Sequence, residues 1–82
     1  MTETQLKVYG VRWCFDCHRT RRFLDSNQVY YEWIDIDNDQ SAEETVIRLN
    51  RGNRSVPTLV FPDATVLVEP SNQALAKKLG LK

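Results

Sequence analysis

The chain has 82 residues, of which 27% are charged and 41% are apolar, and it carries 11 basic and 11 acidic side chains. This balance is that of a folded protein rather than a disordered one, and the length predicts one domain, residues 1–82, with a single modest core. A formal net charge of zero gives no electrostatic reason to expect a nucleic acid or an anionic membrane as a partner.

The first part of the chain alternates between strand and helix patterns. Residues 5–9 (QLKVY) alternate polar and apolar side chains and end at Gly10, which predicts a first strand followed by a loop. From about residue 14 to residue 26 apolar side chains recur at helical spacing, which predicts a first helix. Residues 29–36 (VYYEWIDI) are aromatic and β-branched and predict a second strand.

A second helix and a hairpin follow. Polar side chains in residues 37–41 offer capping oxygens for a helix from about residue 42 to residue 51, and Gly52 is expected to end it. Residues 58–61 (TLVF) and 65–68 (TVLV) flank a short turn, which predicts a hairpin.

A third helix is expected after Pro70, with Ser71 as a candidate N-cap and Gly80 as its stop. The order of elements is therefore β-α-β-α-β-β-α, an α/β fold. The first strand, helix and strand predict a right-handed parallel crossover, and the hairpin adds antiparallel strands. The result is one small mixed sheet covered by helices.

The first ten residues, MTETQLKVYG, lack the basic start and apolar run of a secretory signal. No apolar stretch approaches the roughly 18 residues that a membrane-spanning helix needs. We therefore expect a cytoplasmic protein without a membrane partner. In a reducing compartment, two close cysteines are expected to be catalytic or metal-binding rather than a structural disulfide.

Both cysteines and the only histidine lie within the run RWCFDCH, residues 12–18. The pattern CxxCH is compatible with haem attachment, with a redox dithiol and with most of a zinc site. Haem is disfavoured because Met1 is the only methionine and no second histidine exists to bind the iron. A zinc site closed within one chain lacks a fourth ligand, so we expect no metal ion within one chain, whereas a metal or iron–sulfur centre shared between two chains stays open.

The expected junction of strand and helix gives the two cysteines different roles. Cys14 would lie near unpaired N–H groups and the positive end of the helix dipole. Because thiolate is the nucleophile and is favoured there, we predict that Cys14 attacks and that Cys17, about one turn later, resolves. Arg12 would add positive charge near Cys14, whereas Asp16 would oppose a thiolate.

A second motif, Ser55-Val56-Pro57, precedes the third expected strand. A cis bond before Pro57 would turn the chain and leave the backbone N–H and C=O of Val56 to pair with an extended thiol peptide. The alternative is a trans proline that simply begins a strand. The position of this motif after CxxC in this order of elements favours cis.

Side chains next to these motifs have two interpretations. Arg12 and Arg54 are predicted to make the site electropositive, whereas Arg19 is expected on a solvated helix face. Trp13 and Phe15 would form either an apolar rim for docking a substrate or part of the core.

Together the motifs resemble the glutaredoxin branch of the thioredoxin superfamily over nearly the whole chain. Within it the chain looks most similar to the mycoredoxins, because Trp13 directly precedes Cys14, because residues 50–58 read NRGNRSVPT, and because Pro70-Ser71 replaces a double glycine. The chain departs from the usual pattern at Phe15-Asp16, which puts the redox potential in question. His18 has no role that the resemblance supplies and is expected to be a solvated helix residue.

The resemblance implies a thioredoxin fold with a four-stranded mixed sheet flanked by helices, in which Cys14 is the nucleophile, Cys17 resolves and Pro57 is cis. We expect the small thiol to bind beside residues from both motifs and from the third helix: Arg12, Trp13, Phe15, Val56, Pro57, Ser71 and Asn72. The implied activity is reduction of protein mixed disulfides by a low-molecular-weight thiol as co-substrate, with no tightly bound cofactor. For the mycoredoxins this thiol is mycothiol, and glutathione is the alternative that the missing double glycine weakens.

The expected partners are oxidised or thiolated proteins and either the small thiol or a flavoprotein reductase, and we expect a monomer. One alternative is a dithiol redoxin that passes electrons from thioredoxin reductase to an enzyme such as ribonucleotide reductase. Another is a scaffold that holds an iron–sulfur cluster or a metal between two chains through Cys14.

Overall fold

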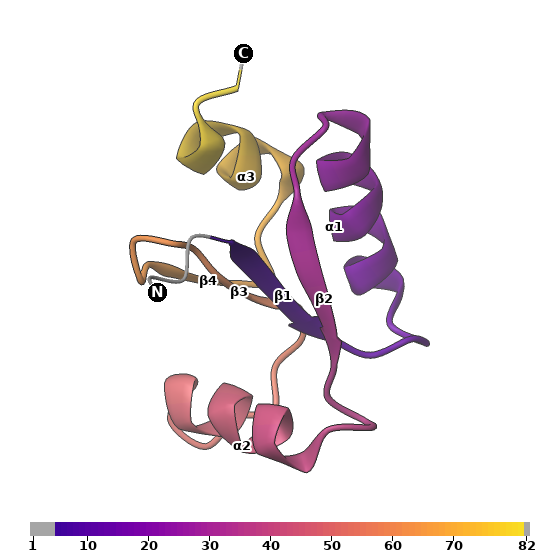
Figure 1. The fold of residues 1–82 in the computed structure, drawn as a ribbon, viewed down its shortest axis with the longest axis vertical. Coiled ribbons are helices and arrows are strands. Elements are labelled where there is room, and N and C mark those ends of the chain that lie inside the picture. The colour runs from indigo at the N-terminus through magenta and orange to yellow at the C-terminus, as the bar shows by residue number, and fades with distance from the viewer. Residues whose placement is uncertain (1–4, 82) are drawn as a thin grey trace.

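Strands and helices follow one another in the predicted order (Figure 1). The computed structural model describes residues 5–81. Its elements are β1 (Leu6–Gly10), α1 (Phe15–Ser26), β2 (Tyr31–Asp35), α2 (Gln40–Leu49), β3 (Thr58–Val60), β4 (Val66–Val68) and α3 (Asn72–Leu79). None of these helices is long and apolar enough to cross a membrane.

The strands form one mixed sheet in the order β2-β1-β3-β4. β1 and β2 are parallel, with Leu6 opposite Tyr31 and Gly10 opposite Asp35, and α1 is the crossover between them. β3 runs antiparallel to β1, and β4 runs antiparallel to β3. This order with these directions is the thioredoxin fold, and the predicted fold class is confirmed.

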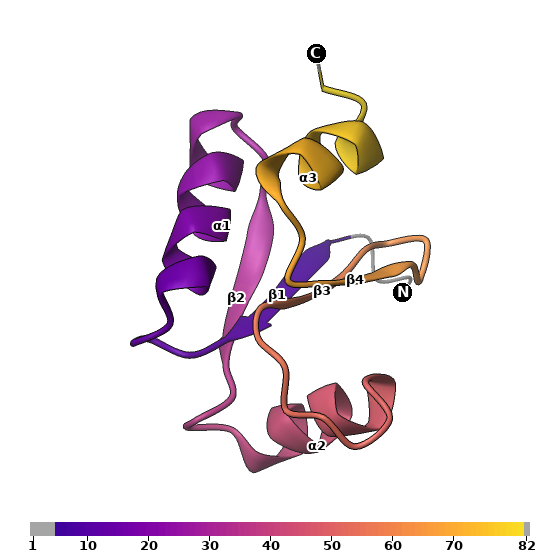
Figure 2. The same ribbon diagram turned by 180° about the vertical axis from the view of Figure 1, so that it is seen from behind.

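The helices cover both faces of the sheet, with α1 and α3 on one face and α2 on the other (Figures 1 and 2). Leu6 and Val8 of β1 belong to the core cluster that contains Leu24 of α1 and Leu75 of α3. The second cluster, on the other face, is made of Tyr9, Val11, Ile36, Ala42 and Val46. Because successive side chains of a strand point to opposite faces, β1 contributes to both cores.

The helix starts are set by side-chain caps. Asp39 accepts a hydrogen bond from the Ala42 N–H (3.0 Å), so α2 begins at Gln40 and ends at Leu49, each two residues earlier than predicted. The sequence offered several capping oxygens in a row, and only the folded chain selects one of them. The predicted cap at Ser71 is confirmed, because its hydroxyl accepts from the Ala74 N–H (3.0 Å).

Gly10 is the last residue of β1 rather than the start of a loop. Because it has no side chain, the Cys17 sulfur and the Trp33 ring can pack against its backbone. A Cβ at this position would lie 2.7 Å from the Sγ of Cys17 and 2.7 Å from a ring carbon of Trp33. Since real side chains do not approach this closely, only glycine permits α1 and the Trp33 ring to pack here.

We therefore expect Gly10→Ala to lower the free energy of unfolding by about 1–3 kcal/mol, the usual cost of overpacking a core. The effect would be read from denaturant unfolding. In the absence of a clash, replacing a glycine by alanine stabilises a protein through the unfolded state, so a more stable variant would contradict the packing argument. A smaller loss in a Trp33→Val background would identify the ring as one source of the clash.

Candidate active site

Cys14 is the N-cap of α1, as the sequence predicts. Its backbone is extended (φ −85°, ψ 116°), and its Sγ accepts a hydrogen bond from the Cys17 N–H at 3.1 Å. The side chain is half-buried and packs beside the core cluster under α2. The sulfur therefore lies at the positive end of a helix, with a backbone donor directed at it.

Cys17, one turn along, is completely buried in the same helix. Burial raises the pKa of its thiol to about 12, and a hydrogen bond with the Cys14 side chain and the charge of Asp16 act in the same direction. Both cysteines are free thiols in this structure. The pair thus combines a partly accessible sulfur with a buried one that stays protonated at neutral pH.

The chain that precedes the cysteines is attached to the rest of the protein by Trp13 and His18. The Trp13 Nε1–H donates to the Asp37 carboxylate at 2.9 Å. The Nε2 of His18 donates to the Arg12 carbonyl at 2.5 Å. His18 is exposed as expected, yet its ring fixes the loop, a contact that no local sequence pattern foretells.

The Arg54 guanidinium donates to the carboxylates of Asp37 (2.5 Å) and Glu43. It therefore links the Ser55-Val56-Pro57 loop to the Asp37 carboxylate that holds Trp13. The hydrogen bonds from Trp13 and then from Arg54 lower the pKa of Asp37. The prediction that Arg54 makes the site electropositive is wrong, because two carboxylates neutralise its charge.

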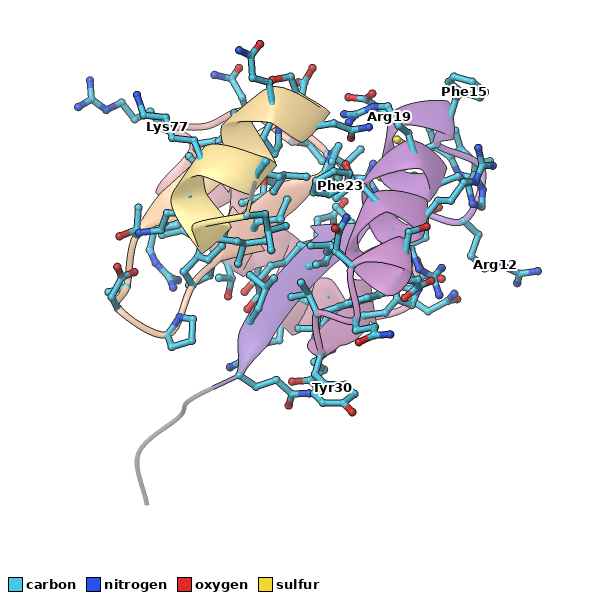
Figure 3. The ribbon with its side chains drawn as sticks, turned by 90° about the horizontal axis from the view of Figure 1, so that it is seen from above. Arg12, Phe15, Arg19, Phe23, Tyr30 and Lys77 are labelled. Atoms are coloured by element: carbon cyan, nitrogen blue, oxygen red, sulfur yellow. The ribbon has the colours of Figure 1, made fainter. Side chains whose placement is uncertain are left out.

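Arg19 joins α1 to the start of α3 (Figure 3). It pairs with Asp16 at 2.9 Å and donates to the Asn72 side-chain oxygen at 2.5 Å and to the Pro70 carbonyl at 2.7 Å. The expectation of a solvated helix face is therefore wrong for Arg19. Its partners Pro70 and Asn72 lie 51 and 53 residues away along the chain, beyond the range of a helical pattern.

Arg12 is exposed, and its side chain extends outward from the loop before α1 (Figure 3). Trp13 and Phe15 are also exposed, with 73% and 84% of their surfaces open to solvent. This exposure excludes the core as the place of these aromatic side chains, and the rim for docking a substrate stays a prediction.

The peptide bond between Val56 and Pro57 is cis, as predicted. Thr58, which is fully buried, fixes the loop, because its hydroxyl donates to the Ser55 carbonyl (2.7 Å) and accepts from the Asn50 side chain (3.0 Å). Val56 packs beside the same core cluster as Cys14. Within residues 5–81 the N–H and C=O of Val56 have no hydrogen-bond partner, so both are available to a ligand.

The start of α3 completes this end of the molecule. The Glu69 N–H donates to the Pro57 carbonyl at 2.8 Å and so attaches the chain before α3 to the proline loop. Ser71 and Asn72, both predicted to bind a thiol, use their side-chain oxygens for the helix cap and for Arg19. Sequence analysis missed Gly10, Arg19, Glu69 and Thr58. Of these four residues, only Gly10 had a local sequence signal, because it is the glycine at the end of the first strand.

Among the described residues, no three His, Cys, Asp or Glu side chains gather into a group that could hold a metal ion.

Comparison with known proteins gives consistent matches. A family model described as Glutaredoxin matches residues 6–66. A protein of Mycobacterium tuberculosis that is provisionally named a glutaredoxin is 37% identical, over 96% of this chain and 94% of its own length. Mycoredoxin 1 of Corynebacterium glutamicum is 36% identical over 82% of each chain. The crystal structure of a glutaredoxin from Archaeoglobus fulgidus has a TM-score of 0.79 and 27% identity, and it covers 93% of this chain and 86% of that one.

The burial of Cys17 predicts selective alkylation. With iodoacetamide at about pH 7, we expect Cys14 to be modified and Cys17 to stay unmodified, because the buried thiol becomes a thiolate only near its pKa of about 12. Peptide mass spectrometry of the reduced protein would locate the label. Equal labelling of both cysteines in the folded protein would contradict this assignment.

The hydrogen bond between Asp37 and Trp13 predicts that Trp13 fluorescence changes when Asp37 is protonated in acid. Because the pKa of Asp37 is lowered, its hydrogen bonds are present above the ordinary aspartate value of about 3.9 and are lost as the pH falls through the lower folded value. In a Trp33→Phe background, Trp13 fluorescence should therefore change with a midpoint below that value. Asp37→Asn should abolish this change, and a change that survives the substitution would exclude Asp37 as its source.

Proposed function

Because the chain belongs to the glutaredoxin family of thiol-disulfide oxidoreductases, we propose that it reduces protein mixed disulfides with a low-molecular-weight thiol. Cys14 is the nucleophile, and either a second thiol molecule or Cys17 resolves the intermediate. The observation that carries this proposal is the contrast between the two sulfurs. The Cys14 sulfur is partly accessible and receives a backbone N–H at 3.1 Å, whereas Cys17 is buried and its pKa is raised to about 12.

In the first step, the Cys14 thiolate attacks the small-thiol sulfur of a mixed disulfide. A bond forms between Cys14 and the small thiol, the original disulfide bond breaks, and the protein thiolate leaves and takes up a proton. The Cys17 N–H that donates to the Cys14 Sγ stabilises the negative charge before the attack.

In the second step, another small-thiol molecule attacks the small-thiol sulfur bound to Cys14. The products are the disulfide of the small thiol and the regenerated Cys14 thiolate. Burial raises the pKa of the Cys17 thiol and shields its sulfur, so Cys17 competes slowly for the same intermediate. Its burial therefore favours a cycle that needs Cys14 alone.

We place the small thiol along the backbone of Val56, whose N–H and C=O are unpaired within the described residues. Pro57 shapes this wall of the site, Trp13 and Phe15 form the apolar rim, and Arg12 lies at the outer edge. The start of α3, at Ser71 and Asn72, would contact the rest of the thiol. This set is drawn from three separate parts of the chain.

Mycothiol is the thiol that we assign, and it acts as a co-substrate rather than as a bound cofactor. The similarity to Mycoredoxin 1 over 82% of the chain supports this choice, as does the absence of a double glycine before α3. We expect residues 1–82 to act as a single monomeric domain in the cytoplasm. Its partners would be thiolated or oxidised proteins.

A second candidate is the dithiol route, in which Cys17 attacks the Cys14 mixed disulfide and a flavoprotein reductase reduces the resulting Cys14–Cys17 disulfide. The 3.1 Å hydrogen bond from the Cys17 N–H to the Cys14 Sγ supports it, because the two cysteines are already in contact. This route requires Cys17, whereas the monothiol route does not.

The test is steady-state reduction of a protein mixed disulfide by the wild type, Cys14→Ser and Cys17→Ser. We expect mycothiol to support turnover in the wild type and in Cys17→Ser, and Cys14→Ser to lose activity by at least about 10³-fold because the nucleophile is gone. Turnover only with thioredoxin reductase, together with an inactive Cys17→Ser, would establish the dithiol route instead. A visible absorption band in the freshly purified protein would point to an iron–sulfur cluster shared between chains.

A further inference from the structure

A hollow of about 420 Å³ lies between the first turns of α1 and the start of α3. It is lined by Asp16, Arg19, Glu69, Ser71 and Asn72. Asp16 lies in the turn that begins at Cys14. The hollow therefore adjoins the proposed thiol site and would receive the part of the thiol that extends beyond its cysteine.

The charged side chains that line this hollow carry a net negative charge. Among the described residues that line it, Arg19 is the only cation, and its guanidinium already contacts Asp16, the Asn72 side chain and the Pro70 carbonyl. Glu69 is exposed, and its carboxylate makes no ion pair or hydrogen bond within residues 5–81. Two carboxylates thus face one guanidinium, which leaves one negative charge free.

The backbone holds Glu69 in place. Its φ is 49°, in the left-handed region that most side chains avoid, and its N–H is bonded to the Pro57 carbonyl at 2.8 Å. The Cα of Glu69 is therefore fixed relative to the proline loop, on which the thiol is expected to lie. A charge at a fixed backbone position beside a ligand discriminates between ligands of different charge.

We propose that Glu69 selects the small thiol by its charge and disfavours thiols that carry carboxylates. This inference rests on the function proposed above. Glutathione has two free carboxylates and one ammonium group, so its net charge is negative, and the unpaired Glu69 disfavours that charge. A thiol whose cysteine is acylated on nitrogen and amide-linked through its carboxyl to a sugar has no such charges, and its hydroxyl groups can donate hydrogen bonds to Glu69 and Asp16.

A single thiol exchange isolates this effect. In the Cys17→Ser protein, the Cys14 thiolate attacks a symmetrical disulfide, forms a mixed disulfide with one half and releases the other half as a thiolate. The second-order rate constant would be measured by mass spectrometry with three probes: glutathione disulfide, the same disulfide with all its carboxylates esterified, and mycothiol disulfide. The quantity of interest is the ratio of the ester rate constant to the acid rate constant.

We expect Glu69→Gln to lower this ratio about three- to tenfold, mainly by speeding the reaction of the acid form, because a like-charge contact near a protein surface is removed. Glu69→Lys should lower it further. The matched control is Glu44→Gln, which removes the same charge from an exposed position on α2, across the sheet. Comparing ratios between variants cancels the different intrinsic reactivities of the two disulfides.

An unchanged ratio in Glu69→Gln would overturn the proposal, and so would an equal fall in Glu44→Gln, since net charge alone would then explain it. If none of the three disulfides modifies Cys14, the proposed function fails together with this inference. If mycothiol disulfide modifies Cys14 but Glu69→Gln leaves the ratio of the ester and acid rate constants unchanged, only the proposed charge selection fails.

Discussion

The close contact between Gly10 at the end of β1 and Cys17 in α1 is the constraint on which the site depends. A single methyl group at Gly10 would come within 2.7 Å of the Cys17 sulfur. Because this contact seats the first turns of α1 against the sheet, Cys17 is fully buried and Cys14, at the helix cap, stays partly accessible. Two chemically identical side chains thereby differ in reactivity, because the Cys14 sulfur is accessible and the Cys17 sulfur is buried and protonated.

Three polar connections hold the surrounding loops at fixed positions. Asp37 links Trp13 to Arg54 before the proline loop, and Arg19 links α1 to the start of α3. The backbone of Glu69 links that start to Pro57. Each connection joins segments that are far apart in the chain, so the site is an assembly of loops supported by the sheet rather than a property of any one motif. Preorganisation of this kind lowers the entropy cost of binding a small, flexible thiol.

Most of the charged side chains around the cysteines are paired with opposite charges within the protein. Arg19 and Arg54 are paired with carboxylates, and Arg12 points outward. Little positive charge is therefore left to attract an anionic thiol, and the unpaired carboxylate at Glu69 acts against one. The hydrogen bond from the Cys17 N–H and the end of the α1 dipole, rather than a surrounding cluster of arginines, provide the positive potential at Cys14.

The sequence by itself determined the order of strands and helices, the position of Cys14 at a helix start, the cis bond before Pro57 and the cap at Ser71. These features depend on periodicity and on short motifs, which involve neighbouring residues. Only the tertiary structure decided which polar residue starts α2, that Gly10 must lack a side chain, and that Arg19 and Arg54 are neutralised. Such contacts join residues as distant as Arg19 and Asn72, 53 positions apart, and no local pattern records which distant groups the fold brings together.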